Sequence, residues 1–567
     1  CAGRKKGTAV IIEDIAVPIQ HLENTIVDVR DLFQRYGYED PVIWGHVFDG
    51  NVHFVLAPDF TDPEAVERYR RFMDDVVALV VDKYNGSLKA EHGTGRNMAP
   101  FVEREWGPEI YGIMQEIKQI FDPENRINPG VIINDDPRAH VRNFKAMPAS
   151  NPLVDACIEC GFCERNCMSH DFTLSARQRI VVFREMARLA RSGGDRARRA
   201  ALAAAYRYYG DETCAADGLC ASSCPVEIDT GRLIKYLRGE SAGAGPRRLA
   251  AWIGRHMDTV TAGARWGLAA VDGCHAVLGT ARMARLSSLL RRISRNLLPA
   301  WTPYMPGNAA AISCAASPPP EAVEAPRVVY FPACISRTMG PSRLDDASAD
   351  LRRTTESLLN KAGYGIVYPE GLDRLCCGMP FASKGFAEAA DERAAALDRA
   401  LLDASENGRI PVLCDTSPCL HHMKETLDPR LDLYEPIEFT LRFLSSRLRF
   451  NRLQETVAIH TVCSAKKMGL EAKLRELAEM CAETVAAPEI ICCGFAGDRG
   501  FTHPELNAFG LRHLKEQLPE GCQGGYSTSR TCEIGLSHHS GMGYRSILHL
   551  VDRCTEPVGG AAERNSV

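Results

Sequence analysis

The sequence lacks an apolar run long enough to cross a membrane, and it lacks a strong excess of either charge. No stretch of its 567 residues approaches the roughly 18 consecutive apolar positions of a membrane span, so no transmembrane helix is expected. Lysine and arginine number 67 against 72 aspartates and glutamates, which gives a net charge of -5. This near-neutral balance gives no support for nucleic acid as the main partner.

The sequence also lacks an initial methionine and a hydrophobic leader. It starts at Cys1, so we expect a part of a longer protein rather than a secreted precursor. Apolar residues make up 45% and charged residues 25% of the chain, which is typical of a soluble globular protein. At roughly 100–200 residues per domain, the length predicts three to five domains.

Cysteine, in contrast, is abundant. The chain contains 22 cysteines, and many of them cluster at short spacings in a chain of enzyme size. A small secreted domain would use such cysteines for disulfides. Here the spacing favours metal or iron–sulfur ligation in a reducing compartment, which indicates a cytoplasmic protein.

The first part of the chain alternates strand-like and helix-like patterns. Residues 9–15, 42–44 and 52–57 are β-branched or apolar runs that predict strands, and residues 21–36 and 63–84 have helical periodicity. Loop residues at Asp122-Pro123 and Asn128-Pro129-Gly130 end this region. We therefore expect a mixed α and β domain over residues 1–137.

The last part of the chain is an internal repeat. Cys334 and Cys463 each follow a strand-like run and precede a Met-Gly pair at the same spacing. Each is followed by a Cys-Cys-Gly triplet and then by a further cysteine after Ser/Thr residues: Cys376, Cys377 and Cys419 in the first copy, and Cys492, Cys493 and Cys532 in the second. This pattern predicts two α/β halves related by a pseudo-twofold axis.

Two Gly-rich segments of the first domain carry a candidate metal site. His46 and His53 flank an Asp-Gly turn, so their imidazoles could converge on one ion in a hairpin. Glu91 and His92 add a carboxylate and a third imidazole within Glu-His-Gly-Thr-Gly. Two histidines and one glutamate with an open position form a catalytic divalent-metal set, most often zinc. The alternative is that these histidines only cap loops and fill turns.

These segments resemble FAD-linked 2-hydroxy-acid oxidases of the vanillyl-alcohol oxidase type. The matching pieces are Gly45-His46 to His53, Glu91 to Gly95, and Phe121-Asp122-Pro123 to Asn128-Pro129-Gly130. The resemblance implies that His46, His53 and Glu91 bind zinc, that His92 is the general base, and that Asn128 sits near the flavin. An imidazole is a competent base near neutral pH. The family's FAD-binding half, with its Gly-rich pyrophosphate loop, is absent, so the chain holds half of an active site.

Two further groups of cysteines have the sequence spacing that is typical of the ligands of a cubane iron–sulfur cluster. Cys157, Cys160, Cys163 and Cys167 follow the C-x2-C-x2-C-x3-C spacing, and Cys214, Cys220 and Cys224-Pro repeat it with Asp217 at the second position. They resemble two-cluster ferredoxins. The resemblance implies one 4Fe-4S cluster on Cys157, Cys160, Cys163 and Cys224. The other cluster would be held by Cys214, Cys220 and Cys167, with Asp217 as an oxygen ligand that makes a 3Fe-4S form accessible.

The repeated Cys-Cys-Gly pattern resembles the cysteine-rich domains of heterodisulfide reductase and of glycolate oxidase iron–sulfur subunits. That family often ends on Cys-x2-Cys, but here the places read Thr416-Ser-Pro-Cys419 and Ser529-Arg-Thr-Cys532. One thiolate is therefore missing from each half. A single cluster shared between the halves, a redox-active thiol pair and a purely structural remnant all remain open, because ligand number decides metal occupancy.

Arginines alternate with tryptophan and leucine over residues 247–300. A basic amphipathic helix can lie on an anionic membrane surface, which would allow a peripheral contact with the inner face of the cell membrane. A solvated or inter-domain face is the alternative and is slightly favoured.

The order of these parts resembles the C-terminal portion of the fused FAD and iron–sulfur D-lactate dehydrogenases of bacteria. The fold class implied is multidomain α+β and α/β: a flavin-oxidase cap domain (1–137), a helical ferredoxin-like module (138–240), an Arg-rich helical segment and linker (241–325), and two pseudo-symmetric α/β cysteine-rich halves (326–450, and 451–567 with a tail). The implied reaction is oxidation of a D-2-hydroxy acid, with hydride transfer to FAD and one-electron transfer through the clusters to a quinone or cytochrome.

D-lactate is the expected substrate, with D-2-hydroxyglutarate and then glycolate as the alternatives. A different class of function is a non-catalytic iron–sulfur electron-transfer subunit that borrows its flavin.

Overall fold

The computed structural model describes residues 5–39, 42–145, 147–310, 325–345 and 350–558, which form a mixed α and β structure. The chain divides into two compact units, residues 1–160 with 183–196 and residues 161–182 with 197–567. The linker predicted at Ser317 to Pro320 lies outside the described residues. Among the residues that are described, every helix is too short or too polar to cross a bilayer. The described cysteines are all free thiols.

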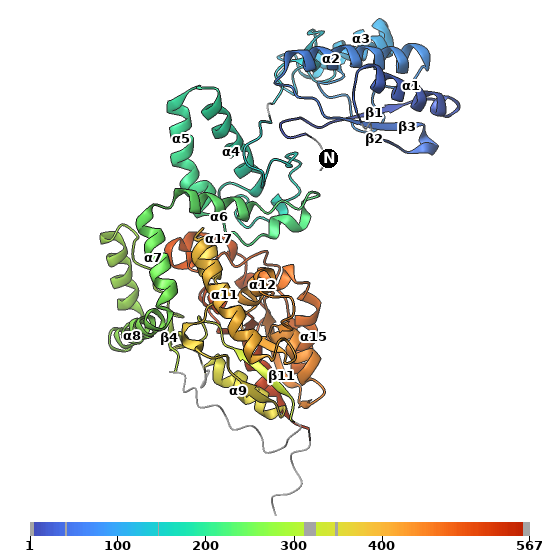
Figure 1. Ribbon diagram of the computed structural model, residues 1–567. Helices are drawn as coiled ribbons and strands as arrows, with labels where there is room; N and C mark the ends of the chain where they lie inside the picture. Colours follow the sequence, from blue (N-terminus) through green and yellow to red (C-terminus); the bar gives the residue numbers. More distant parts are fainter. Residues whose placement is uncertain (1–4, 40–41, 146, 311–324, 346–349, 559–567) are drawn as a thin grey trace, which may run out of the picture. The chain divides into compact units, whose positions relative to one another are not determined.

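The first unit is built on a three-stranded antiparallel sheet with the strand order β1-β3-β2. Figure 1 shows the helices of this unit beside the sheet. The core joins apolar side chains of the sheet and of two helices, such as Phe33, Phe54 and Phe72. Except for α3, which was not predicted, the elements agree with the predicted strands and helices. They are β1 (Ile11–Ala16), α1 (Leu22–Arg35), β2 (Val42–Trp44), β3 (Asn51–Leu56), α2 (Pro63–Val77) and α3 (Val102–Phe121).

Local sequence explains where α2 starts and where α3 bends. The Asp62 carboxylate accepts the Glu64 backbone N–H at 2.9 Å, and Pro63 supplies the first helical position of α2. In α3, Gly107 has φ 80° and is followed by Pro108, so the helix is interrupted there. The part of α3 after this interruption keeps an exposed apolar face.

Helices and irregular segments occupy the region between the first sheet and the repeat. The helices are α4 (Ala176–Arg191), α5 (Arg196–Tyr206), α6 (Thr230–Ser241), α7 (Ala244–Arg255) and α8 (Met257–Ile293), and residues 183–191 of α4 belong to the first unit. Several arginines of the 247–300 segment contact the repeat. Arg291 donates to the carbonyl oxygens of Phe501 (2.8 Å) and Thr502 (3.1 Å), which supports the inter-domain interpretation of this segment.

The repeat forms two four-stranded parallel sheets, with the orders β7-β5-β8-β9 and β12-β11-β13-β14. In each sheet the first strand of the half lies between the second and the third, and the fourth is at the edge. The strands are β5 (Arg327–Phe331), β7 (Gly365–Val367), β8 (Val412–Cys414) and β9 (Leu433–Tyr434), and then β11 (Leu453–Ile459), β12 (Ala482–Ala486), β13 (Gly524–Ser527) and β14 (Tyr544–Ser546). The pseudo-twofold relation between the halves stays a prediction.

Helices connect these strands, as parallel pairing requires. The first half contains α9 (Leu351–Lys361), α10 (Met379–Ala382), α11 (Ala387–Ala404), α12 (Ser417–Thr426) and α13 (Pro436–Phe439). The second contains α14 (Cys463–Lys467), α15 (Glu471–Cys481), α16 (Arg499–Thr502), α17 (Pro504–Gly510), α18 (Arg530–Ser540) and α19 (Ile547–Cys554). Two short antiparallel pairs complete the unit: β4 (Pro306–Asn308) with β6 (Met339–Ser342), and β10 (Leu448–Phe450) with β15 (Thr555–Pro557).

A fully buried carboxylate should make the stability of the repeat depend on pH. Burial raises the pKa of Glu435 from 4.5 to about 7, although its carboxylate accepts hydrogen bonds from Ser417 Oγ (3.0 Å) and the Glu438 N–H (2.7 Å). The folded chain therefore holds this proton more tightly than the unfolded chain. The protonated carboxyl therefore stabilises the folded chain. This stabilisation is fully present below pH 4.5 and is lost as the pH rises through 7.

We therefore compare the free energy of unfolding of Glu435→Gln with that of the wild type at two pH values. The difference should favour the variant by about 2–3 kcal/mol more at pH 8 than at pH 5. Urea unfolding followed by circular dichroism at the two pH values measures this difference. Glu483→Gln, at an exposed position, should keep the wild-type pH dependence. Parallel pH profiles for Glu435→Gln and the wild type would contradict the expectation.

Candidate functional site

The site of the first unit is centred on a pair of residues that face each other across β1 and β3. Asp14 and His53 are direct partners in the antiparallel register, so their side chains lie on the same face of the sheet. Both are buried, with 0% and 2% of their surface exposed. The distance from His53 Nδ1 to Asp14 Oδ1 is 3.5 Å, and among the described residues this buried nitrogen has no hydrogen-bond partner. The two groups are thus close but do not form a hydrogen bond.

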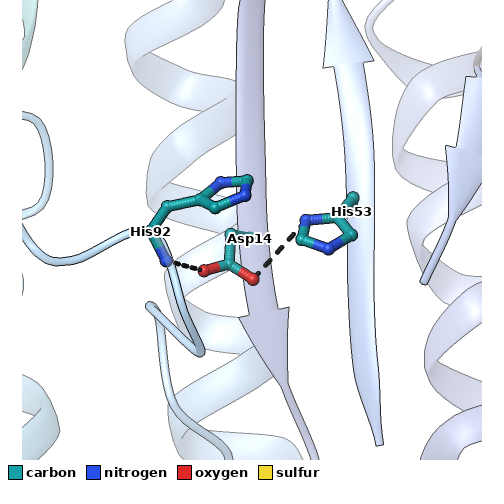
Figure 2. Close-up of side chains that lie close together, drawn as sticks. All are labelled: Asp14, His53 and His92. Carbon is teal, nitrogen blue, oxygen red and sulfur yellow. Dashed lines mark hydrogen bonds and ion pairs between the residues drawn. The ribbon is translucent and has the colours of Figure 1, made fainter. Parts of the chain in front are cut away.

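Asp14 holds the loop that carries Glu91 and His92. Its Oδ2 accepts the backbone N–H groups of Ala90 (3.1 Å), Glu91 (2.7 Å) and His92 (2.7 Å). Figure 2 shows the carboxylate lying between His53 and the His92 backbone. Burial raises the pKa of Asp14, but the hydrogen bonds from the His92 and Glu91 backbones outweigh burial and leave the pKa below its usual range. Asp14 is thus a charged anchor for the loop.

The three predicted ligands of a divalent metal meet at Glu91. Its Oε1 lies 3.2 Å from His46 Nε2 and 3.0 Å from His53 Nε2. One ligand atom from each of the three residues lies within 4.8 Å of the other two. His46 and Glu91 are exposed and His53 is buried, so the set is anchored on the sheet and open on one side. This donor set and its accessibility fit a catalytic divalent-metal site.

A second group of possible ligands consists of Asp14, His53 and His92. One ligand atom from each also lies within 4.8 Å of the other two. Asp14 is less suited to bind an ion because its oxygens already accept backbone N–H groups and the Asn51 amide (Nδ2 to Oδ1, 2.6 Å). A carboxylate that orients ligands from outside the coordination sphere is a common arrangement. Of the two groups, His46, His53 and Glu91 are therefore better suited to hold a divalent ion, and Asp14 contacts the elements that carry them.

Two glycines allow the hairpin loop to pack closely enough to place His46. A Cβ at Gly45 would lie 2.0 Å from the Asn51 carbonyl oxygen. Gly50 has φ 64°, and its Cβ would lie 2.0 Å from the Val17 carbonyl oxygen. Only glycine fits these positions without displacing the backbone. The loop therefore returns tightly from β2 to β3, and His46 and His53 converge as the hairpin prediction requires.

His92 and Asn128 lie at the exposed rim of the site. The His92 ring stacks on His53, with ring centroids 4.8 Å apart and an interplanar angle of 22°. Asn128 belongs to an exposed turn, and this turn reaches the His92 loop through two hydrogen bonds. Ile132 N–H donates to the Gly95 carbonyl at 3.1 Å, and the Arg96 guanidinium donates to the Pro129 carbonyl at 3.1 Å. The two Gly-rich segments and the Asn-Pro-Gly turn are thus parts of one surface.

In the second unit, a small cavity is lined by Cys167, Cys214, Cys220 and Asp217, the set predicted for the second ferredoxin-like cluster. Backbone N–H groups of Ala216 and Thr230 point at the sulfurs of Cys214 (3.4 Å) and Cys220 (3.3 Å). Such N–H donors and a nearby cation suit thiolates that hold an iron–sulfur cluster.

The cation beside this cavity is Arg179, which is 1% exposed. Its Nη1 lies 3.6 Å from Cys167 Sγ. Its remaining nitrogens donate to the carbonyl oxygens of Gly210 (2.6 Å) and Thr213 (3.2 Å). The guanidinium is therefore fixed in place, where it can offset the negative charge of a cluster.

The ligands predicted for the other cluster are divided between the compact units. Cys157 and Cys160 belong to the first unit, and Cys163 and Cys224 to the second. This ligand set stays a prediction.

Each half of the repeat brings its predicted cysteines together at the carboxyl edge of its sheet, where ligands of parallel sheets commonly bind. Thiol contacts run from Cys334 to Cys376, then to Cys377 and to Cys419. The same sequence of contacts links the corresponding cysteines of the second half, Cys463, Cys492, Cys493 and Cys532. In both triplets the glycine N–H points at the sulfur of the first cysteine at 3.5 Å, from Gly378 to Cys376 and from Gly494 to Cys492.

A cation at the same position in each half supports the Cys-Cys-Gly segment. Arg337 follows Cys334 by three residues and donates to the carbonyl oxygens of Leu372 and Leu375 at 2.5 Å each. Lys466 follows Cys463 by three residues and donates to the carbonyl oxygens of Ile490 (2.8 Å) and Ile491 (3.2 Å). Both cations therefore bind the backbone just before the cysteine pair. Positive charge also lies near the first cysteine of each half, from Arg337 at Cys334 and from Lys467 at Cys463.

Two residues of these sites were missed by sequence reasoning. Asp14 could have been found from the unusual Glu13-Asp14 pair inside an apolar strand, since buried acids are rare unless they are paired. Cys414, the last residue of β8, is fully buried and interacts electrostatically with Cys377 and Cys334. It stands outside the expected Cys-x2-Cys spacing, and only the sheet brings it to the other thiols. The first half therefore gathers five cysteines rather than four.

Comparisons with known proteins match three segments of the chain. Residues 1–132 match the C-terminal domain of FAD linked oxidases, residues 153–228 a 4Fe-4S dicluster domain, and residues 328–424 a cysteine-rich domain. This is the combination predicted from the resemblance to fused FAD and iron–sulfur D-lactate dehydrogenases, and the prediction is confirmed at that level. The chain therefore combines a segment similar to the C-terminal domain of FAD linked oxidases with segments similar to a 4Fe-4S dicluster domain and a cysteine-rich domain.

Curated relatives match the first domain. The D-2-hydroxyglutarate dehydrogenase of Escherichia coli is 38% identical over 133 residues, which are 23% of this chain and 13% of that protein. The glycolate oxidase subunit GlcD of Bacillus subtilis is 29% identical over 131 residues, or 23% of this chain and 27% of that protein. A probable mitochondrial D-lactate dehydrogenase of Danio rerio is 30% identical over 131 residues, or 23% of this chain and 26% of that protein. The chain thus spans a small part of the length of each relative.

Proposed function

We propose that the chain oxidises a D-2-hydroxy acid to the 2-oxo acid and passes the electrons through iron–sulfur clusters to a quinone or cytochrome. The observation that carries this proposal is the convergence of His46, His53 and Glu91 beside His92, in a domain that matches FAD-linked oxidases. The domain combination supports D-lactate as the substrate. D-2-hydroxyglutarate is the second candidate, favoured by the E. coli relative.

The residues of the first unit have separate tasks in this reaction. His46, His53 and Glu91 would hold the divalent metal, which when bound would polarise the hydroxyl and carboxylate of the substrate. FAD, when bound, would accept the hydride from C2. His92 takes the hydroxyl proton, because its exposed imidazole lies beside the metal ligands on a loop whose backbone is fixed by Asp14. Asn128, in the turn that bonds to the His92 loop, would lie near FAD when it is bound.

Asp14 fixes the distance between the metal ligands and the base. Its negative charge is held by three backbone N–H groups, and these belong to the residues that carry Glu91 and His92. The same carboxylate faces His53 on the neighbouring strand. One buried residue therefore sets the position of a ligand from β3 and of the loop opposite it.

We expect Asp14→Asn to weaken divalent metal binding by roughly 10- to 100-fold, the usual cost of losing a residue that orients a ligand. The amide has one acceptor oxygen, and its NH2 group would face backbone donors. Competition with a metallochromic chelator measures the affinity. Asp49→Asn, an exposed acid in the adjacent turn, is the matched control and should bind as the wild type does. Equal affinities for Asp14→Asn and the control would show that Asp14 does not position the ligands.

The flavin-binding partner of this domain has a suitable surface on α3. Beyond the interruption at Gly107, Ile113, Ile117, Ile120 and Phe121 project from the helix, and Ile120 and Phe121 are 73% and 81% exposed. This spacing of three and four residues gives one continuous apolar stripe. An apolar stripe of this size in a soluble protein marks an interface. We infer that an FAD-binding domain covers it and completes the active site.

The clusters supply one-electron carriers, which connect a two-electron oxidation to a quinone or cytochrome. The ferredoxin-like module over 138–240 would hold two of them, and the halves at 326–450 and 451–567 a further redox group each. Apolar side chains of α8, among them Trp266 (79% exposed), lie among arginines. A peripheral contact of these exposed side chains with an anionic membrane, where a quinone acceptor would be reached, is the alternative to the inter-domain role that the Arg291 contacts favour.

Turnover with a panel of acids tests the substrate. In protein that carries its FAD-binding domain, D-lactate should reduce an artificial acceptor, and L-lactate should not. Faster turnover with D-2-hydroxyglutarate would identify the second candidate as the substrate. Reduction by neither D-acid nor by glycolate would contradict the proposed reaction.

A further inference from the structure

Asp217 has one carboxylate oxygen that the structure leaves without a hydrogen bond. Its Oδ1 accepts the Leu219 N–H at 3.1 Å. Its Oδ2 is buried and makes no well-formed hydrogen bond with the described residues, and its polar neighbour is the thiol of Cys492. A buried carboxylate oxygen without a partner is costly, and a bound cation is one of the few groups that would satisfy it.

The side chain of Asp217 reaches the cysteine site of the second half of the repeat. It contacts the thiol of Cys492 and interacts with Cys463. Met168, Leu219, Cys492 and Leu506 pack here as one apolar cluster, with Cys463 at its margin. Water is therefore excluded from the space between the ferredoxin-like module and the second half, and Asp217 is a polar group that spans it.

A cation also lies at this junction. A Cβ at Gly218 would lie 3.3 Å from Lys467 Nζ, so this ammonium is next to the Asp217 loop. Lys467 also interacts electrostatically with Asp217 and with Cys463. The junction can therefore accommodate the negative charge of several thiolates and a carboxylate around a metal group.

The two halves differ in the number of thiols. The first half has five, because Cys414 at the end of β8 joins the other four. The corresponding residue at the end of β13 is Ser527, so the second half has four. Asp217 brings an additional donor to the half that lacks the fifth thiol.

We propose that Asp217 Oδ2 is the fifth donor of a metal site formed with Cys463, Cys492, Cys493 and Cys532. The proposal rests on the repeat holding an iron-containing group, as the proposed function requires. The cavity of Cys167, Cys214 and Cys220 is then left with three thiolates, and Asp217 is part of its wall. An oxygen donor is a harder and weaker ligand for iron than a thiolate, so the iron bound by Asp217 is the exchangeable one.

The test removes the carboxylate in two backgrounds of the anaerobically prepared chain. One background carries Cys214→Ser and Cys220→Ser, which disables the ferredoxin-like set. The other carries Cys492→Ser and Cys493→Ser, which disables the second half. Iron per chain and the electron paramagnetic resonance spectrum are measured with and without Asp217→Asn, and circular dichroism checks that each variant folds.

In the first background, Asp217→Asn should lower the iron content by roughly one atom per chain. In the second background it should change nothing, because the metal site that Asp217 completes has already been removed with Cys492 and Cys493. Asp229→Asn is the control, since the Asp229 carboxylate lies 4.0 Å from Cys220 Sγ and caps α6; it should leave the second half's iron intact. An effect of Asp217→Asn confined to the second background, or no effect in either, overturns the proposal.

The same measurements separate this proposal from the proposed function. If the Cys492→Ser, Cys493→Ser variant loses no iron, the second half holds no iron-containing group. Both the proposed electron transfer through this half and the proposed role of Asp217 are then wrong. If that variant loses iron but Asp217→Asn does not, only the assignment of Asp217 fails.

Discussion

Replacing His53 with alanine should remove one divalent metal ion per chain and abolish turnover in protein that carries its FAD-binding domain. The imidazole is buried at the end of the hairpin, and its Nε2 lies 3.0 Å from Glu91 Oε1. Its loss leaves two exposed ligands, which cannot keep an ion against water. His46→Ala should have the same effect. Elemental analysis after desalting measures the metal, and acceptor reduction measures turnover.

His92→Ala should instead keep the metal and lower kcat by roughly 10²- to 10⁴-fold, which is the usual contribution of a general base. His21→Ala is the matched control, because this imidazole belongs to the same unit, lies tilted against Tyr84 and is not one of the predicted site residues. Unchanged metal content in both His46→Ala and His53→Ala would contradict the metal assignment. Loss of metal in His92→Ala would place His92 among the ligands.

The second large effect concerns the repeat. Serine at Cys376, Cys377, Cys492 and Cys493 should lower iron per chain and abolish reduction of the external acceptor, while reduction of the flavin by substrate survives. The reason is the common geometry of the halves, in which thiols, glycine N–H groups and a cation converge at the edge of each sheet. Absorbance of the flavin and of the acceptor, followed in one anaerobic experiment, separates the two steps.

A matched control is available in the second half. Cys481 and Cys554 are buried, and their thiols contact each other away from the Cys-Cys-Gly segments. Serine at both positions should lower stability without changing iron. If the four-cysteine variant also loses stability only, with full iron and intact acceptor reduction, the repeat is a structural remnant.

Patterns that are local in the sequence predicted the local structure well. Alternating apolar residues and turn signals predict most of the strands and helices of the first unit, and the repeated cysteine spacing predicts two α/β halves. Each depends on neighbours within a few residues or on direct comparison of two similar segments. The convergence of His46 and His53 was also predictable from the tight Asp-Gly hairpin, whereas the resemblance to a known family was needed to place Glu91 beside them.

Contacts between distant segments were not predictable. Asp14 acts on Ala90, Glu91 and His92 through backbone N–H groups, which leave no trace in side-chain identity. Cys414 joins its site only because β8 ends there. The approach of Asp217 to Cys492 depends on how the ferredoxin-like module packs on the repeat, and no spacing within either segment encodes it.

The central claim is that electrons from a D-2-hydroxy acid enter the iron–sulfur clusters of this chain. The direct measurement is electron paramagnetic resonance on anaerobic protein that carries its FAD-binding domain, frozen after mixing with D-lactate or D-2-hydroxyglutarate. We predict that the flavin absorbance bleaches and that signals of reduced 4Fe-4S clusters appear in the same sample. Bleached flavin with clusters that stay oxidised, although dithionite reduces them, would contradict the account.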